Sequence, residues 1–264
     1  MTDSPLGDYA HARSLAGRRT IVTGAAQGVG EGIAAALLRR GGSVLLVDHQ
    51  QEALEATTAS FTATGLRAEA LTADLRDPAS ARRIVDAAVE VFGGVDALVN
   101  NAIATNEPKP FTDIDEVDYD LVFDVGPKAT FFLMQAVHPV MAAAGGGVIV
   151  NLGSASGTGG QARFAAYAGA KEAIRGMSKA AALEWGRDNI RVNVVCPFAD
   201  SPGVQFWQEV APKDFDRALK SVPLRRVGRT EQDIGAVVAF LVGTDADFIT
   251  GQTIHIDGGM GVHR

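Results

Sequence analysis

The sequence lacks four features, and each absence excludes a class of protein. One cysteine, Cys196, leaves no internal disulfide to form. No apolar run approaches the ~20 residues that cross a bilayer, and no basic and apolar amino-terminal stretch predicts a signal peptide. Positive charge is scarce, since 24 Lys and Arg stand against 31 Asp and Glu, for a net charge of -7. We therefore expect a cytoplasmic protein that binds neither nucleic acid nor membrane and takes a small molecule as partner.

The rest of the composition favours one large α/β domain. Of the 264 residues, 47% are hydrophobic, which is ample for a large core. Residues 1–17 are polar and irregular and are predicted to form an amino-terminal tail, which leaves residues 18–264 as a single domain. His138 and His255 show no metal-ligand spacing, so no metal site is predicted.

Strand and helix patterns alternate along the chain. Short apolar runs predict strands at residues 20–23, 43–48, 67–72, 97–100, 148–152, 191–195 and 253–256. Helical patterns occupy residues 30–40, 50–64, 78–92, 117–144, 164–186 and 231–242. Strands this apolar, separated by helices, predict a doubly wound Rossmann fold: a seven-stranded parallel sheet flanked by helices on both faces. Ligands of such folds bind at the carboxyl ends of the strands.

A glycine-rich turn follows the first predicted strand and opens the first helix. Its residues Gly24, Gln27, Gly28, Val29 and Gly30 would bring backbone N–H groups and the positive end of the helix dipole close to a pyrophosphate. The spacing differs from the GxGxxG fingerprint, so an ordinary strand-to-helix turn is the alternative.

Asp48 ends the second predicted strand. There a carboxylate can accept hydrogen bonds from the adenosine ribose hydroxyls and would repel a 2′-phosphate, which favours NAD over NADP. Neutral Gln27, where an arginine could have paired with a phosphate, favours the same cofactor. A helix cap is the alternative role for Asp48.

Ser154, Tyr167 and Lys171 predict the chemistry. Tyr167 and Lys171 are four residues apart and share a helix face, so the ammonium is expected to lower the pKa of the phenol from its ordinary value. A phenol that gives up its proton near neutral pH can act as acid or base on an alcohol. Ser154, just past the fifth predicted strand, can hydrogen-bond the substrate oxygen. Without the surrounding fold, a solvated Tyr and Lys with a turn serine would be the simpler interpretation.

In this order the motifs resemble the short-chain dehydrogenase/reductase family, in its compact single-domain branch. The resemblance covers nearly the whole chain and rests on further motifs: Asp74-Leu75, Asn100-Asn101-Ala102, Arg191-Val192-Asn193, Thr250-Gly251-Gln252-Thr253 and Asp257-Gly258-Gly259. It implies hydride transfer between a nicotinamide and a carbinol carbon, with Tyr167 as proton donor and acceptor and Lys171 also holding the nicotinamide ribose.

The resemblance also implies the remaining cofactor contacts. Asp74 and the Leu75 backbone would bind adenine, and Asn101 and Ala102 would line the adenosine ribose side. Pro197 would lie near the nicotinamide. For Asn101, taken alone, a loop cap is the default alternative.

Three positions depart from the family pattern. Gly126 stands where the family usually carries an asparagine that holds a relay water, although Pro127 should still kink the helix and free a backbone acceptor near Phe123. We predict that backbone carbonyls around residues 123–126 hold that water. Ile103 and Phe198 replace usual glycines and add apolar bulk near the nicotinamide, and Ser201 is only a doubtful counterpart of the residue that contacts the carboxamide.

Residues 198–226 predict a short helical lid that carries Phe206, Trp207 and Phe215, which either pack the lid or contact substrate. With Phe164 nearby, we predict an apolar or aromatic secondary alcohol or ketone as substrate. The helices at 117–144 and 164–186 resemble those through which the family assembles, which implies a homodimer or homotetramer. Two alternatives remain: a non-catalytic NAD-binding sensor or scaffold, and an NADPH-dependent ketoacyl-type reductase.

Overall fold

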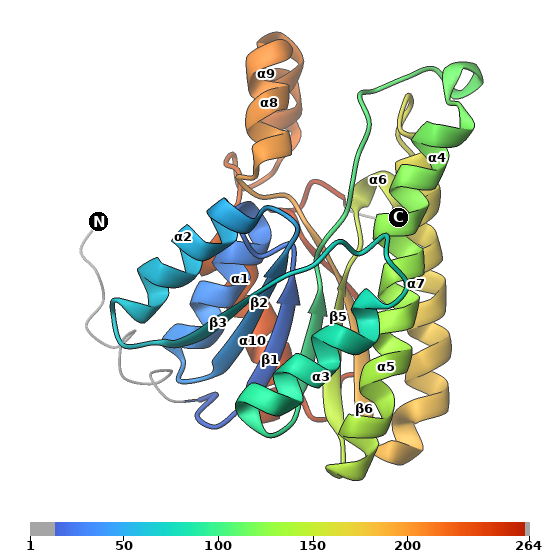
Figure 1. Cartoon of the computed structure of the whole chain (residues 1–264). Coiled ribbons are helices and arrows are strands. Elements are labelled where there is room, and N and C mark those ends of the chain that lie inside the picture. The colour runs from blue at the N-terminus through green and yellow to red at the C-terminus, as the bar shows by residue number, and fades with distance from the viewer. Residues whose placement is uncertain (1–13, 262–264) are drawn as a thin grey trace.

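The computed structural model describes residues 14–261 and contains one seven-stranded, wholly parallel sheet (Figure 1). Its strands are β1 (Arg19–Thr23), β2 (Ser43–Asp48), β3 (Arg67–Thr72), β4 (Ala97–Asn100), β5 (Gly147–Leu152), β6 (Ile190–Pro197) and β7 (Thr253–Ile256). Their order is β3-β2-β1-β4-β5-β6-β7, so the strand order reverses between β1 and β4. The predicted doubly wound fold is confirmed, and its ligand crevice is expected at this reversal.

Helices cover both faces of the sheet (Figure 1). One face packs against α1 (Gly28–Arg39), α2 (Gln51–Thr62) and α10 (Ala236–Val242), and the other against α3 (Ser80–Phe92), α5 (Ala129–Ala143) and α7 (Ala165–Trp185). Because side chains alternate along a strand, neighbouring residues serve different cores. Val22 and Leu46 pack into the first core, whereas Ile21 and Leu45 pack into the second.

The shorter elements gather mostly at the carboxyl ends of the strands. These are η1 (Phe111–Asp113), α4 (Glu116–Phe123), the π-helix η2 (Asp124–Lys128), α6 (Ala155–Thr158), α8 (Pro202–Val210) and α9 (Pro212–Ser221). Figure 1 shows α8 and α9 standing beyond the sheet, where the lid was predicted. Before α8 and after α9, a parallel β-bridge pairs Ala199, in the segment that leads into these helices, with Gly228, in the segment that follows them. The remaining elements among the described residues are the 3₁₀-helices η3 (Gly186–Asp188) and η5 (Thr244–Ala246) and the π-helix η4 (Thr230–Gly235).

The long helix predicted over residues 117–144 is interrupted. The five-residue π-helix η2 separates α4 from α5 and contains Pro127, which has no N–H to donate to the preceding turn. The α-helical pattern thus changes at Pro127, while the kink with a free acceptor near Phe123 stays a prediction.

The predicted tail boundary at residue 17 is wrong. Leu15 is buried in the core formed with α1 and α10, and its N–H donates to the Arg40 carbonyl, so the ordered domain begins before residue 18. The remainder of the predicted tail, residues 1–13, lies outside the described residues. From residue 14 to residue 261, each helix is too short or too polar to traverse a lipid bilayer.

Candidate active site

The turn between β1 and α1 is built on backbone atoms that leave no space for side chains. Gly24 and Gly28 both have φ of +63°. A Cβ at Gly30 would lie 2.0 Å from the Gly24 carbonyl oxygen and 2.6 Å from Asn101 Nδ2. Asn101 Nδ2 in turn donates to the Thr23 and Gly24 carbonyls, at 2.9 Å each. Asn101, which follows β4, therefore fixes the turn that follows β1, and the strand order reverses between these two strands.

The first turn of α1 offers donors at this place. Gln27 precedes the helix in extended conformation, and Gly28, Val29 and Gly30 form its first turn. The first N–H groups of any α-helix have no intrahelical acceptor and can bind an anion. These N–H donors, at the positive end of the helix dipole, fit a dinucleotide pyrophosphate.

Asp48 connects the glycine turn to the segment that leads into α2. Its Oδ2 accepts from the Ala26 N–H at 3.2 Å, and its Oδ1 accepts from the N–H of Gln50, the residue that caps α2, at 3.1 Å. The carboxylate thus ties the glycine turn to the start of α2. Because an ionised carboxylate has about four acceptor sites, it can still accept from ribose hydroxyls.

Asp74 already has a partner. Arg76 forms a bidentate pair with it, with Nη2 2.5 Å from Oδ2 and Nε 3.0 Å from both oxygens. These hydrogen bonds lower the pKa of Asp74 to about 2. Adenine would therefore share Asp74 with Arg76, a residue the sequence analysis did not single out. The neighbouring motif residue Leu75 is only partly buried.

Ser154, Tyr167 and Lys171 lie together where β5 ends. Ser154 caps α6, and its hydroxyl forms a hydrogen bond with Tyr167 on α7. One turn further along α7, Lys171 is 3% exposed and donates from Nζ to the Leu152 carbonyl at 2.7 Å. The Lys171 Nζ is 5.6 Å from the centroid of the Tyr167 ring. An acid–base phenol, a hydroxyl donor and a buried ammonium thus share one corner.

The electrostatics of this corner differ from the sequence expectation. Burial raises the pKa of Tyr167, and the hydrogen bond from Ser154 only partly opposes that effect. Burial also lowers the pKa of Lys171 to about 8. The predicted lowering of the Tyr167 pKa is therefore not present in this structure, because burial of the phenol has the largest effect on it.

Comparison with known proteins decides the family. A family model described as enoyl-(acyl carrier protein) reductase matches residues 24–261, nearly the whole chain. The chain belongs to the short-chain dehydrogenase/reductase family. It is 35% identical over 252 residues to the 12alpha-hydroxysteroid dehydrogenase of a Clostridium species, covering 93% of this chain and 97% of that one. To the galactitol 2-dehydrogenase of Agrobacterium fabrum it is 36% identical over 250 residues, covering 90% and 95%.

Solved structures of the family superpose closely. Levodione reductase has a TM-score of 0.89 at 29% identity, covering 94% of this chain and 99% of that one. A short-chain type dehydrogenase/reductase from Mycobacterium ulcerans has a TM-score of 0.88 at 28% identity, covering 94% and 90%. The chain is thus an oxidoreductase of a family that uses a nicotinamide cofactor and acts on alcohols.

Two departures from the family pattern turn out to be neighbours. A Cβ at Gly126 would lie 2.5 Å from Cδ1 of Ile103 and 3.9 Å from Cβ of Ala170, which precedes Lys171. The Ile103 side chain thus fills the space into which a side chain at position 126 would extend. This complementarity explains why the bulky residue and the glycine occur together. The relay water expected at the backbone carbonyls of residues 123–126 stays a prediction.

The end of β6 and the start of the lid complete the cofactor side. Pro197 is the last residue of β6, and burial raises the pKa of its neighbour Cys196 to about 11. Ser201 caps α8, accepting from the Val204 N–H at 3.3 Å. The next residue, Pro202, approaches so closely that its Cδ would lie 2.9 Å from a Cβ at Gly28. The lid therefore begins directly against the glycine turn.

Ala102, which follows β4, also contacts the strand before the glycine turn: its backbone N–H donates to the Thr23 hydroxyl at 3.1 Å.

Within the lid, Trp207 packs edge-to-face on Phe215 with ring centroids 5.4 Å apart. For these two residues the contact is the packing role that the sequence left open, whereas Phe206 is exposed.

The pocket beside Tyr167 has a mixed lining, whereas the sequence predicted an apolar one. Its walls come from the segment after β4, from α4 and from the start of α7: Asn106, Glu107, Lys109, Ile114, Asp118, Val122, Arg163, Phe164, Ala166 and Tyr167. No periodic pattern in the sequence marks the charged members, because a loop and a helix bring them together.

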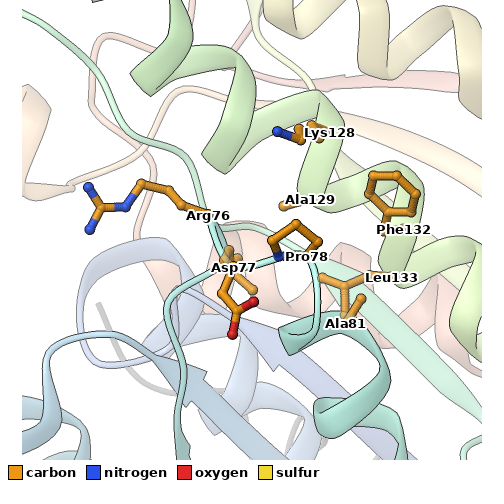
Figure 2. A pocket seen from close by; sticks show the side chains of 9 residues that line it. Arg76, Asp77, Pro78, Ala81, Lys128, Ala129, Phe132 and Leu133 are labelled. Atoms are coloured by element: carbon orange, nitrogen blue, oxygen red, sulfur yellow. The ribbon is translucent and has the colours of Figure 1, made fainter. Parts of the chain in front are cut away.

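A second hollow lies between the loop after β3 and the helix α5 (Figure 2). Figure 2 shows Lys128, at the end of η2, and Phe132, on α5, across from Pro78 and Ala81, while Arg76 extends away from them. Ser154, Tyr167 and Lys171 do not line it. Among residues 14–261, no group of three or more His, Cys, Asp and Glu side chains could hold a metal ion.

Proposed function

We propose that this protein is an NAD(H)-dependent dehydrogenase that interconverts a secondary alcohol and a ketone at Ser154, Tyr167 and Lys171. The observation that carries the proposal is the convergence of these three side chains at the end of β5, on the edge of the parallel sheet that also carries the glycine turn after β1. A bound nicotinamide would supply the hydride acceptor or donor.

The roles of the three residues follow from their positions. Tyr167 gives a proton to the carbonyl oxygen or takes one from the alcohol. Ser154 bonds the Tyr167 hydroxyl and can hydrogen-bond the substrate oxygen as charge develops on it. Lys171 is held by the Leu152 carbonyl and keeps donors for the nicotinamide ribose, since an ammonium has three.

NAD rather than NADP is proposed from Asp48. Its carboxylate is held in place by two backbone N–H groups at the end of β2, where a 2′-phosphate would meet a like charge. Asp74, Leu75, Asn101, Ala102 and Pro197 are proposed as the further cofactor contacts. The alternative of an NADPH-dependent ketoacyl-type reductase makes the opposite prediction for this preference.

The substrate is proposed to present an apolar skeleton to Ile114, Val122 and Phe164 in the pocket beside Tyr167. The relatives support an alcohol as the reacting group, since one is named for a hydroxysteroid and another for galactitol. Gly126 favours the alternative of a non-catalytic sensor, because it removes a side chain that the family uses in the proton relay.

The deciding experiment measures reduction of NAD and NADP with secondary alcohols, and oxidation of NADH and NADPH with ketones. Tyr167→Phe is expected to lower turnover by about 10²–10⁴-fold while NADH fluorescence shows unchanged binding. Turnover that prefers NADP would contradict the cofactor assignment. Tight NADH binding without turnover across the panel would favour the sensor.

We also propose that the protein forms a homodimer or homotetramer in the cytoplasm. Phe131 and Phe132 on α5 and Leu183 on α7 are exposed apolar residues of the two helices implicated by the sequence, and Leu183 is 86% exposed. Sedimentation of the purified protein as a monomer would contradict the assembly.

A further inference from the structure

An ion pair stands in the same pocket as the proposed acid–base residue. Lys109 Nζ lies 2.5 Å from Asp118 Oδ2, and both residues line the cavity that Tyr167 lines. The side chain of Asp118 is 14% exposed and that of Lys109 is 38% exposed, so the pair faces the cavity without being cut off from water. The hydrogen bond to Asp118 raises the pKa of Lys109, which keeps the ammonium charged.

The wall that carries this pair is fixed by further contacts. Asn106 Nδ2 donates to the Asp118 carbonyl at 2.7 Å, and the Lys109 N–H donates to the Arg163 carbonyl at 3.1 Å. Arg163 Nη2 donates back to the Pro108 carbonyl at 3.0 Å. Arg163 has φ of +69°, a conformation that a non-glycine residue keeps only where its surroundings hold it. The ion pair is therefore presented to the cavity by a braced segment.

The pair has unused hydrogen-bonding capacity of both kinds. An ammonium has three donors, of which Asp118 takes one, and a carboxylate accepts at about four sites. A hydroxyl group both donates and accepts, so it can bond to Lys109 and Asp118 at once. A carboxylate in this place would meet Asp118 and Glu107, and an ammonium would meet Lys109 and Arg163. A neutral hydroxyl therefore fits the charges better than either ion.

We propose that Lys109 and Asp118 form a subsite for a second, non-reacting hydroxyl of the substrate, so that preferred substrates are diols or polyols. This inference rests on the proposed function of Tyr167, which fixes the position of the reacting carbinol. The carbon chain between the two hydroxyls lies along Ile114, Val122 and Phe164, which line the same cavity. The subsite thus names the substrate class for a pocket whose apolar lining alone would accept any alkanol.

The test compares secondary diols with secondary mono-alcohols of the same chain length, from four to six carbons, as probes. The ratio of kcat/KM for diol over mono-alcohol, corrected for the two equivalent hydroxyls, is expected to be about ten or more in the wild type. In the double variant Lys109→Met with Asp118→Leu, the ratio is expected to fall to about one, because neither partner of the hydroxyl remains.

Arg82→Met is the matched control. It removes an exposed ion pair with Asp86 on α3, away from the pocket, and is expected to leave the ratio unchanged. Circular dichroism and NADH binding check that the double variant folds; if it does not, Lys109→Met alone removes the donor of the pair and is expected to lower the ratio several-fold.

The outcomes separate the subsite from the proposed function. Equal oxidation of diols and mono-alcohols by the wild type, or a ratio that survives in the folded double variant, overturns the subsite while leaving the dehydrogenase intact. A folded variant in which both substrate classes fall equally shows that the pair only braces the wall, and also overturns it. Failure of every alcohol with NAD and with NADP overturns the proposed function, and the subsite with it.

Discussion

The glycine turn and the wall around Lys109 lie at the same edge of the sheet, yet they are held by different means. In the turn, backbone meets backbone: a Cβ at Gly30 would lie 2.0 Å from the Gly24 carbonyl oxygen. In the wall, side chains such as Lys109 and Asp118 join a loop to a helix. The turn therefore tolerates no added atom, whereas the wall can exchange side chains. A fold built this way can keep its cofactor while its substrate changes.

The largest effect expected from this comparison comes from Gly30→Ala. The added methyl group would overlap the Gly24 carbonyl and Asn101 Nδ2, so the backbone must move. We expect a loss of about 4 kcal/mol in the free energy of unfolding, together with loss of NADH binding. Urea denaturation and fluorescence titration measure the two effects.

Gly203→Ala, in α8, is the matched control for this change. A Cβ there would meet no described atom within 4 Å, so the substitution should change stability by about 1 kcal/mol or less. If Gly30→Ala were as mild as this control, the turn would have to be more adaptable than its contacts imply.

Lys171 gives a second prediction, which concerns how the stability of the protein depends on pH. Its pKa is about 8 in the folded protein, against 10.5 ordinarily, so between these values the unfolded chain binds more protons. The titration of Lys171 therefore raises the free energy of unfolding by about 3 kcal/mol between pH 8 and pH 10.5. Below pH 8 the amine is protonated in both states, so this gain in stability is absent.

Lys171→Met lacks this rise. The unfolding free energy of the variant minus that of the wild type should thus shrink by about 3 kcal/mol as the pH increases through this range. Denaturation of both proteins at several pH values gives the difference, in which the titration of other groups largely cancels. A difference that stays constant with pH would show that the buried amine carries no such cost.

Ile103, which follows β4, and Gly126, in η2, lie close together. Gly126→Asn places its Cβ against Cδ1 of Ile103, so we expect a loss of about 1–2 kcal/mol in stability. Adding Ile103→Ala removes the overlapping atom and should recover most of that loss. A double-mutant cycle measures the coupling, and strictly additive effects would argue against the contact.

The same pair of variants tests the proton relay. With Ile103→Ala as the background, Gly126→Asn should change kcat by no more than a few-fold if backbone carbonyls already hold the relay water. A gain of about ten-fold or more would instead show that the natural relay is impaired.

The last effect is expected at Asp48 and concerns cofactor choice. In Asp48→Asn the single amide oxygen can accept from only one of the backbone N–H groups of Ala26 and Gln50, and the charge that would repel a 2′-phosphate is gone. The ratio of kcat/KM for NADP over NAD should rise by about ten-fold, which corresponds to about 1.4 kcal/mol. Asp86→Asn on α3 removes an exposed charge elsewhere and should not alter the ratio.

The strands and the glycine turn could be read from the sequence because their signals are local. Apolar runs such as residues 43–48 are buried on both faces of a central strand, and the observed β2 has the predicted bounds. The helix predicted over residues 117–144 was less accurate, since a π-helix interrupts it where Gly126 lies close to Ile103 and to Ala170 of α7. Leu15 was missed because one apolar residue in a polar stretch has no periodicity.

By itself the sequence determined the doubly wound sheet, the turn that fits a dinucleotide and the residues Ser154, Tyr167 and Lys171. Only the tertiary structure decided that burial raises the Tyr167 pKa, that Arg76 occupies Asp74, and that Ile103 fills the space beside Gly126. It alone joined Lys109 to Asp118. The reason is physical: periodicity and backbone sterics act between near neighbours in the chain, whereas desolvation and ion pairing depend on which distant residues the fold brings together.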